Sequence, residues 1–137
     1  AKESHKGIVA FFANIKQARD YAVNEIVKFD NVITNDGNAY NKDTGIFTAR
    51  KPGLFVFYFS TLSAQGGLFL FDLFLNNEIL ASAYENVGSS YGQGGNSAIV
   101  RIKTGDQVCV KAKQASKIYN NPDRPYATFS GYSLRRE

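Results

Sequence analysis

The six residues from Leu54 to Phe59, with the sequence LFVFYF, are all large and apolar or aromatic. Successive side chains of a β-strand point to opposite faces, so both faces of this strand have to be covered. One face is expected to meet an opposing sheet. The other has to meet a loop, a helix or another subunit, because an exposed stripe of that size is itself an association site. The run therefore predicts a buried strand in a layered β-structure.

A second run, from Leu68 to Leu75, has the same two-faced character. Its odd-numbered positions are all apolar, and its even-numbered positions are apolar except for Asp72. A carboxylate on a covered face is costly unless it is hydrogen-bonded, so Asp72 is expected to have a partner.

The rest of the chain consists of short strand-like runs separated by Gly, Asn, Asp and Ser clusters, which is typical of a sandwich or jelly roll. The expected strands are 8–13, 32–34, 45–49, 54–62, 68–75, 79–83, 97–103, 107–112 and 127–134. Over residues 12–29 the apolar spacing also fits an amphipathic helix, a second interpretation of that segment. The β-branched residues of the segment suit a strand at least as well.

Two tight turns are predicted from local sequence. Asn76-Asn77 should connect two strands, because asparagine tolerates positive φ. The pair Pro52-Gly53 is typical of a type II turn, with Gly53 at positive φ.

Size and composition predict one compact domain. A chain of 137 residues buries about two-thirds of its unfolded surface, and a charged fraction of 20% argues against disorder. No apolar run is long enough to span a bilayer, so no membrane insertion is expected. The single cysteine, Cys109, has no partner for an intrachain disulfide and is expected to be a small buried hydrophobe.

Catalytic chemistry has little support in the sequence. The one histidine, His5, lies in a polar N-terminal segment, so neither a Ser-His-Asp nor a Cys-His arrangement can be built on a structured base. A zinc site with His and Cys ligands lacks donors for the same reason. Carboxylate pairs remain formally open, although no spacing singles one out. We therefore expect a protein that is not an enzyme.

An ordered series of aromatic, amide and glycine positions runs through the first half of the chain: Phe29, Asn35, Tyr40, Phe47, Gly53, Phe57 and Phe59. This spacing resembles the signature of the C1q globular domain family. The one departure is Phe55, where the family usually has tyrosine. Two further stretches, 105–108 with the sequence GDQV and 129–132 with FSGY, extend the resemblance over residues 8–134.

The resemblance implies an all-β jelly-roll β-sandwich of about ten strands, similar to C1q and tumour necrosis factor. It implies one globular domain over residues 1–137, of which 1–7 would be an N-terminal tail. It also implies a homotrimer and a secreted protein, although the first residues contain no signal-peptide core and fit a cytosolic protein equally well. No collagen-like repeat is present, so a bare head domain is expected.

Two loops contain candidate ligand-binding residues. The glycine-rich run 88–96 lacks the pattern of a phosphate-binding loop, and its simplest interpretation is a flexible connection between strands without a binding role. The run 117–126 is stiffened by two prolines, and turn chemistry explains part of it. The predicted ligand-binding residues are Tyr91, Gln93, Asn96, Tyr119, Arg124 and Tyr126. The resemblance makes Gln93 a weak candidate calcium ligand, with calcium possible and not required.

Three classes of function follow. The first is a soluble recognition protein, a lectin of innate immunity that binds carbohydrate or other microbial surface ligands as a trimer. The alternative is a secreted trimeric ligand for a cell-surface receptor, and an enzyme is the third.

A net charge of +4 favours anionic partners, but the basic residues are scattered, which argues against nucleic acid. Arg50-Lys51 and Arg135-Arg136 are expected to be solvated charges. An OB-fold is the alternative β-structure, but such a barrel needs only about five strands and this chain offers more.

Overall fold

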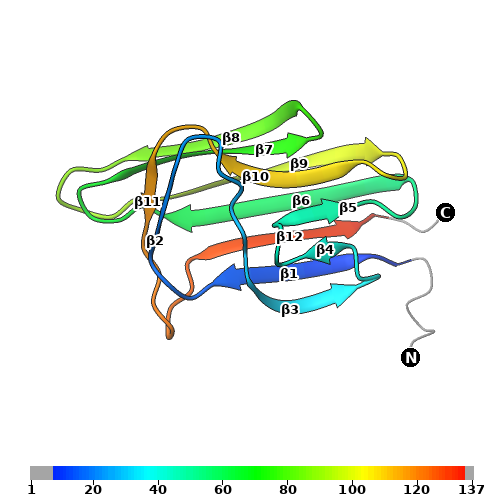
Figure 1. The fold of residues 1–137 in the computed structure, drawn as a ribbon, viewed down its shortest axis with the longest axis horizontal. Helices are drawn as coiled ribbons and strands as arrows, with labels where there is room; N and C mark the ends of the chain where they lie inside the picture. Colours follow the sequence, from blue (N-terminus) through cyan, green and yellow to red (C-terminus); the bar gives the residue numbers. More distant parts are fainter. Residues whose placement is uncertain (1–7, 135–137) are drawn as a thin grey trace.

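The protein is a two-layered antiparallel β-sandwich in the computed structural model, which describes residues 8–134 (Figure 1). The first sheet has the order β3-β1-β12-β6-β9, and the second has the order β4-β5-β10-β7-β8. A third pair, β2 and β11, lies at one end. The strands of the first sheet are β1 (Ala10–Ile15), β3 (Asn31–Asp36), β6 (Gly53–Leu62), β9 (Gln93–Ile102) and β12 (Ala127–Ser133). The others are β2 (Arg19–Tyr21), β4 (Tyr40–Asn41), β5 (Ile46–Thr48), β7 (Leu68–Leu75), β8 (Glu78–Asn86), β10 (Gln107–Ala112) and β11 (Ser116–Ile118).

This architecture confirms the all-β jelly-roll prediction. Each of the nine expected strand ranges overlaps an observed strand, and the described residues add the short strands β2, β4 and β11 to reach twelve. The helical interpretation of residues 12–29 is wrong. The segment instead contains part of β1, the strand β2, a turn at residues 23–24 and a bridge at Ile26, and the Val27 N–H donates to the carbonyl of Val110. The expected tail, residues 1–7, and the pair Arg135-Arg136 lie outside the described residues.

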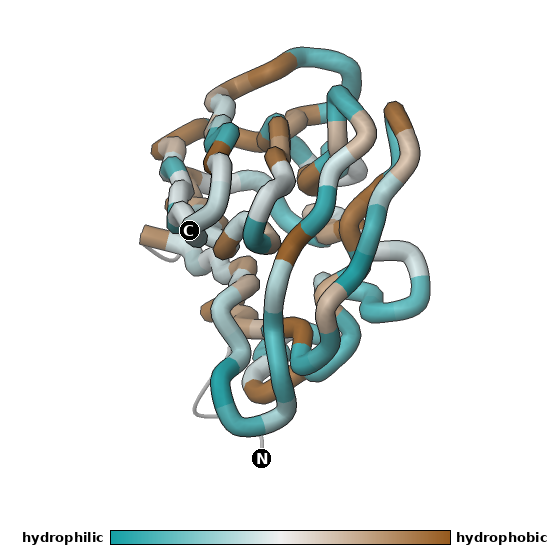
Figure 2. Tube along the Cα trace, turned by 90° about the vertical axis from the view of Figure 1, so that its left-hand side faces the viewer, coloured by the Kyte–Doolittle hydropathy of each residue, from teal (hydrophilic) through white to brown (hydrophobic). Residues whose placement is uncertain are grey.

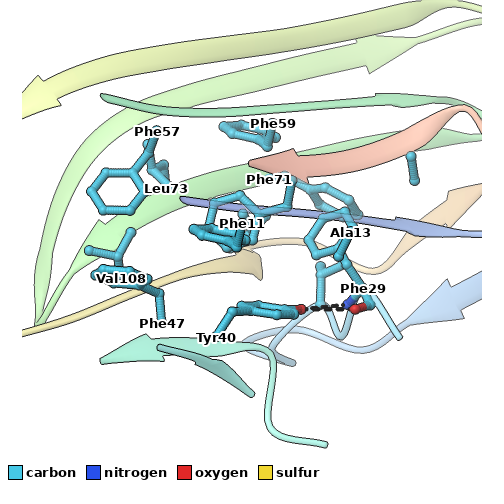
Figure 3. Packing of buried hydrophobic residues seen from close by; sticks show 14 of the residues in the cluster. Phe11, Ala13, Phe29, Tyr40, Phe47, Phe57, Phe59, Phe71, Leu73 and Val108 are labelled. Atoms are coloured by element: carbon cyan, nitrogen blue, oxygen red, sulfur yellow. Dashed lines mark hydrogen bonds between the residues drawn. The ribbon is translucent and has the colours of Figure 1, made fainter. Parts of the chain in front are cut away.

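The core between the sheets is rich in aromatic side chains (Figure 3). The Phe11 ring stacks on the Tyr40 ring with centroids 4.9 Å apart and an interplanar angle of 4°. Gly131 of β12 faces the rings of Phe11 and Phe57, and a Cβ there would lie 2.6 Å from the Phe57 ring and 2.7 Å from the Phe11 ring. The glycine of the FSGY stretch is therefore explained by the space that two phenylalanine rings occupy.

The sequence signature has a physical explanation in the contacts of Tyr40. Its hydroxyl accepts a hydrogen bond from the Phe29 N–H at 3.0 Å and donates to the Phe29 carbonyl at 3.1 Å (Figure 3). The Asn35 amide bonds both the N–H and the carbonyl of Tyr40, at 3.2 and 2.8 Å. Three residues of the series thus fix one another across eleven positions of chain.

Of the two predicted turns, one is present. Asn76 has a φ of 53° between β7 and β8, as expected for a tight turn. The type II turn at Gly53 is wrong, because Gly53 begins β6, is buried and does not have a left-handed φ. Lack of space is a weaker constraint there, since a Cβ on Gly53 would lie 3.3 Å from the Phe55 ring.

The second run, β7, is covered on both faces, as its sequence requires. Asp72 is buried, and its carboxylate accepts a hydrogen bond of 2.6 Å from the Ser82 hydroxyl on β8. Phe74 lies beneath Lys111 and Lys113, whose ammonium groups are 4.7 and 5.4 Å from its ring centroid. Cys109 is also buried, and desolvation raises the pKa of its thiol, which fits a structural and unreactive cysteine.

The outward surface of the first sheet remains apolar and open. Phe12, Tyr58, Ile99 and Tyr132 all point outward and are exposed, and Val56, between them in the register, is half-buried. We refer to these five side chains as the outer apolar face. One face of the LFVFYF strand is therefore covered by the second sheet, and the chain alone leaves the other face partly uncovered.

Candidate functional site

The connections β1–β2, β6–β7, β8–β9 and β11–β12 meet at one end of the sandwich, on the left of Figure 1. The Ser63 N–H after β6 donates to the carbonyl of Gly92, which joins the β6–β7 turn to the β8–β9 turn. The Ala64 N–H donates to the carbonyl of Lys117 on β11. Viewed onto this end, the outermost turns are mainly hydrophilic (Figure 2).

Three tyrosines from two of these connections pack together. The ring centroids of Tyr91 and Tyr119 are 5.4 Å apart in an edge-on arrangement, and those of Tyr119 and Tyr126 are 6.3 Å apart. Tyr91 is 48% exposed, whereas the other two are half-buried. These three residues are called the tyrosine cluster below. The structure thus joins two loops that the sequence predicted separately.

Amide side chains hold the segment between β11 and β12 in place. The buried Asn120 accepts hydrogen bonds of 2.8 Å from the N–H groups of both Tyr126 and Ala127. Its amide nitrogen donates to the carbonyl of Gln17, in the connection between β1 and β2, at 3.1 Å. Tyr119 and Tyr126 therefore stand on a frame that is anchored at its middle.

Arg124 lies in the turn at the tip of this segment. The Asn121 side-chain oxygen accepts hydrogen bonds from the N–H groups of Asp123 and Arg124, at 2.9 and 3.0 Å, which closes the turn. Asn121 also donates to the Tyr119 hydroxyl at 3.1 Å. Among the described residues, the Arg124 guanidinium has no hydrogen-bond or ion-pair partner, so its charge is free near the tyrosine cluster.

Gln93 and Asn96 do not belong to this cluster. The glycine-rich run is strand from Gln93 onward, so the connection is only residues 87–92. The two side chains project from opposite faces of β9, because they are three positions apart in an unbroken register with β6. Asn96 donates to the carbonyl of Ser82 on β8 at 3.0 Å, and Gln93 donates to the Ser60 hydroxyl at 3.3 Å. Both amides therefore make hydrogen bonds within the sandwich.

Gln93 was also the weak candidate calcium ligand, and calcium binding stays a prediction. Calcium takes about six to eight oxygen ligands, and Gln93 offers a single amide oxygen. Within residues 8–134, no group of three or more His, Cys, Asp or Glu side chains is arranged to hold a metal ion.

One of the formally available carboxylates, Asp106, has a role in a turn. Asp106 accepts hydrogen bonds from the Lys103 N–H and the Asn76 amide, and these bonds lower the pKa of its carboxyl. His5 lies outside the described residues. No helix in the described part of the chain is long and apolar enough to cross a membrane.

A cavity of about 560 Å³ beside β3, β4 and β5 was not anticipated from the sequence. Its polar lining includes Asn38, Lys42, Thr48 and Arg50, and Arg50 was expected to be merely solvated. The one available signal was the density of asparagine between residues 35 and 41.

The fold and the loop end define a jelly-roll domain whose exposed side chains are suited to binding. The family model of the C1q domain matches residues 10–134. The chain belongs to the C1q domain family.

The chain is also similar to individual proteins in sequence or in fold. The chain is 29% identical over 134 residues to one of the subunits of the complement C1q subcomponent of Rattus norvegicus, covering 97% of this chain and 52% of the rat protein. It thus spans about half the length of that curated relative. The globular domain of zebrafish complement 1qA superposes with a TM-score of 0.78 at 21% identity, covering 94% of this chain and 99% of the other. Eiger TNF from S. frugiperda gives a TM-score of 0.74 at 11% identity, covering 95% and 93%.

Proposed function

We propose that this protein is a secreted recognition protein without enzymatic activity, which binds carbohydrate on microbial surfaces as a homotrimer. The observation that carries the proposal is the tyrosine cluster beside the free Arg124 guanidinium. An extracellular role in innate immunity is supported by membership of the C1q domain family. That part of the proposal comes from the family alone.

The chemistry of the cluster suits a sugar. Exposed tyrosine rings offer a flat apolar surface for the C–H face of a pyranose, and their hydroxyls can exchange hydrogen bonds with sugar hydroxyls. The guanidinium of Arg124 adds a preference for carboxylated or sulfated sugars. No acid-base pair is placed beside the rings in the described part of the chain, so the arrangement supports binding and no reaction.

A single site of this kind should bind weakly, because a shallow surface site buries little of a sugar. Three copies on one molecule would raise the avidity for a repeating surface by a factor of about 100 or more if they engage together. The outer apolar face supports the trimer, because an open patch of aromatic and aliphatic side chains is stabilised by association. Cyclic symmetry would close the assembly at a fixed number of copies.

The test is a glycan array probed with the purified protein, with and without calcium. We expect binding to multivalent acidic glycans that falls by about tenfold or more in Tyr91→Ala. Tyr84→Ala is the matched control, since Tyr84 is about as exposed but lies on β8. Arg124→Gln should lose the preference for anionic glycans and flatten the salt dependence of binding.

A blank array in both conditions would overturn the carbohydrate proposal. The alternative, a secreted trimeric ligand for a receptor protein, would then be the better interpretation. One observation favours that alternative, which is the likeness of the fold to Eiger TNF. A receptor ligand should leave the array blank and still assemble through the outer apolar face.

A further inference from the structure

The cavity beside β3, β4 and β5 has a composition that suits a small ligand. Its volume of about 560 Å³ lies within the range usual for small-molecule sites. Val32 and Ala39 supply an apolar part of the lining, while the side chains of Asn38 and Thr48 supply polar groups. An apolar surface with a few converging polar groups is the usual character of such sites.

The polar side chains of the cavity lining differ in whether they already have hydrogen-bond partners within the protein. The amide of Asn35, which also lines the cavity, is fully engaged with the backbone of Tyr40. The side chains of Asn38 and Thr48, in contrast, have no hydrogen-bond partner among the described residues. Asn38 has a φ of 53°, and its carbonyl accepts a hydrogen bond of 3.0 Å from the Arg50 guanidinium. Arg50 is thereby held at the cavity with most of its donors unused.

The charge of the cavity lining is positive. Lys42 and Arg50 line it, and no acidic side chain of the described residues does. Arg50 is bonded to a backbone carbonyl, which leaves its charge without a carboxylate against it in this part of the structure. Lys42 lies 3.5 Å from Asp43, but both side chains are more than half exposed, so that ion pair is weak.

We propose that this cavity binds the carboxylate or sulfate group of an acidic sugar. The anion would lie against Arg50, with Lys42 at longer range, and hydroxyls of the ring would reach Asn38 and Thr48. The site is separate from the tyrosine cluster. It adjoins Arg50, shortly before β6 starts, whereas the cluster lies beyond the other end of β6. The proposal therefore does not depend on the proposed carbohydrate site.

The test uses NMR of the ¹⁵N-labelled protein, titrated separately with glucuronic acid, glucose and inorganic sulfate. We expect glucuronic acid to shift the amide signals of residues 38–50 with an affinity in the range of about 1–10 mM. Glucose, which has the same ring without the charge, should bind about tenfold more weakly or worse. Sulfate alone should shift Arg50 and leave Thr48 unmoved if the ring contributes to binding.

Matched variants separate a defined site from general attraction to a basic protein. Arg50→Gln should weaken glucuronic acid binding by about tenfold or more, whereas its neighbour Lys51→Gln, with the same change in net charge, should not. Both variants should retain the wild-type melting temperature, because both side chains are exposed. Tyr91→Ala should leave this binding intact even if glycan-array binding is lost. Equal effects of Arg50→Gln and Lys51→Gln, or no shifts near the cavity, would overturn the proposal.

Discussion

A single hydroxyl, that of Tyr40, organises one side of the core. It pairs with both polar groups of the Phe29 backbone, and both residues are buried. A peptide group without a partner in such a place loses its water without compensation. The aromatic position of the family signature is therefore constrained by hydrogen bonding as well as by ring packing. This explains why the series extends beyond apolar residues.

Tyr40→Phe should lower the free energy of unfolding by about 1–3 kcal/mol. The ring would still stack on Phe11, but the N–H and carbonyl of Phe29 would lose their partner. Urea denaturation measures the change, and Tyr132→Phe, on the exposed outer apolar face, is the control. Equal stability of the two variants would show that the hydroxyl contributes little.

Because the same hydroxyl is buried, we expect the protein to lose stability in alkaline solution. Burial raises the pKa of Tyr40 and Tyr21 well above the ordinary tyrosine value of about 10. Above a pH of about 10 the unfolded chain releases these protons while the folded chain keeps them, so stability falls as pH rises. Each residue should contribute a slope approaching about 1.4 kcal/mol per pH unit. Urea titrations between about pH 9 and 11 should show a shallower slope for Tyr40→Phe, and identical slopes would contradict the pKa shift of Tyr40.

At the scale of elements, the segment between β11 and β12 depends on Asn120. This one side chain ties the segment to the β1–β2 connection and bonds two consecutive N–H groups where β12 begins. The tyrosine cluster is thus built on a loop whose shape is fixed by internal hydrogen bonds. A fixed loop loses less conformational entropy when a ligand binds.

Asn120→Ala should release this segment. We expect faster hydrogen exchange at the amides of Tyr126 and Ala127, and a loss of about tenfold or more in glycan binding if the cluster is the site. Asn121→Ala is a useful comparison, because it removes the side-chain hydrogen bonds of the turn at Arg124 and leaves the Asn120 bonds in place. Unchanged exchange at Tyr126 and Ala127 in Asn120→Ala would contradict the anchoring role.

The strands show what sequence patterns can and cannot predict. Long apolar runs such as β7 were predicted to the residue, because alternation and length leave few other structures. The start of β9 was missed because Gly94 and Gly95 are typical of a loop. In the structure, glycine is needed in this strand, because a Cβ on Gly95 would clash with the carbonyl oxygen of Phe59 on β6. Only the paired strand reveals that constraint.

At the scale of the whole molecule, the outer apolar face is the main feature that one chain leaves unsatisfied. Ile99 is 67% exposed in the middle of β9, beside Val56 in the register. The second sheet has an exposed isoleucine as well, Ile79, which is 49% exposed and lies on β8 near the turn at Asn76. The two isoleucines therefore provide a direct comparison of the two outer surfaces.

Ile99→Lys should dissociate the proposed trimer, because burying a lysine ammonium in an apolar contact is costly. Sedimentation equilibrium at micromolar concentration should give a trimer for the wild type and for Ile79→Lys, and a monomer for Ile99→Lys. A monomeric wild type would contradict the trimer. Dissociation by Ile79→Lys alone would place the contact on the second sheet.

The candidate site was predictable only in part. Tyr91, Tyr119 and Tyr126 stood out in the sequence because aromatic side chains on glycine- and proline-shaped loops are suited to stacking and hydrogen bonding with a ligand, and the structure brings them together. Gln93 was assigned to a loop because the start of β9 was misjudged. The cavity at Arg50 could not be found, since its lining comes from three strands and their turns, whose spatial order the sequence does not contain.

The first strand begins and the last strand ends at the same end of the sandwich. β1 begins at Ala10 and β12 ends at Ser133, on adjacent strands at the end of the sandwich away from the tyrosine cluster (Figure 1). If the protein were attached to a support through either chain terminus, its tyrosine cluster would face the solution. In the proposed trimer, three clusters would then face outward in one plane. Such an arrangement would present all three tyrosine clusters to a facing surface, and a sensor chip coated through a terminal tag would keep these clusters accessible.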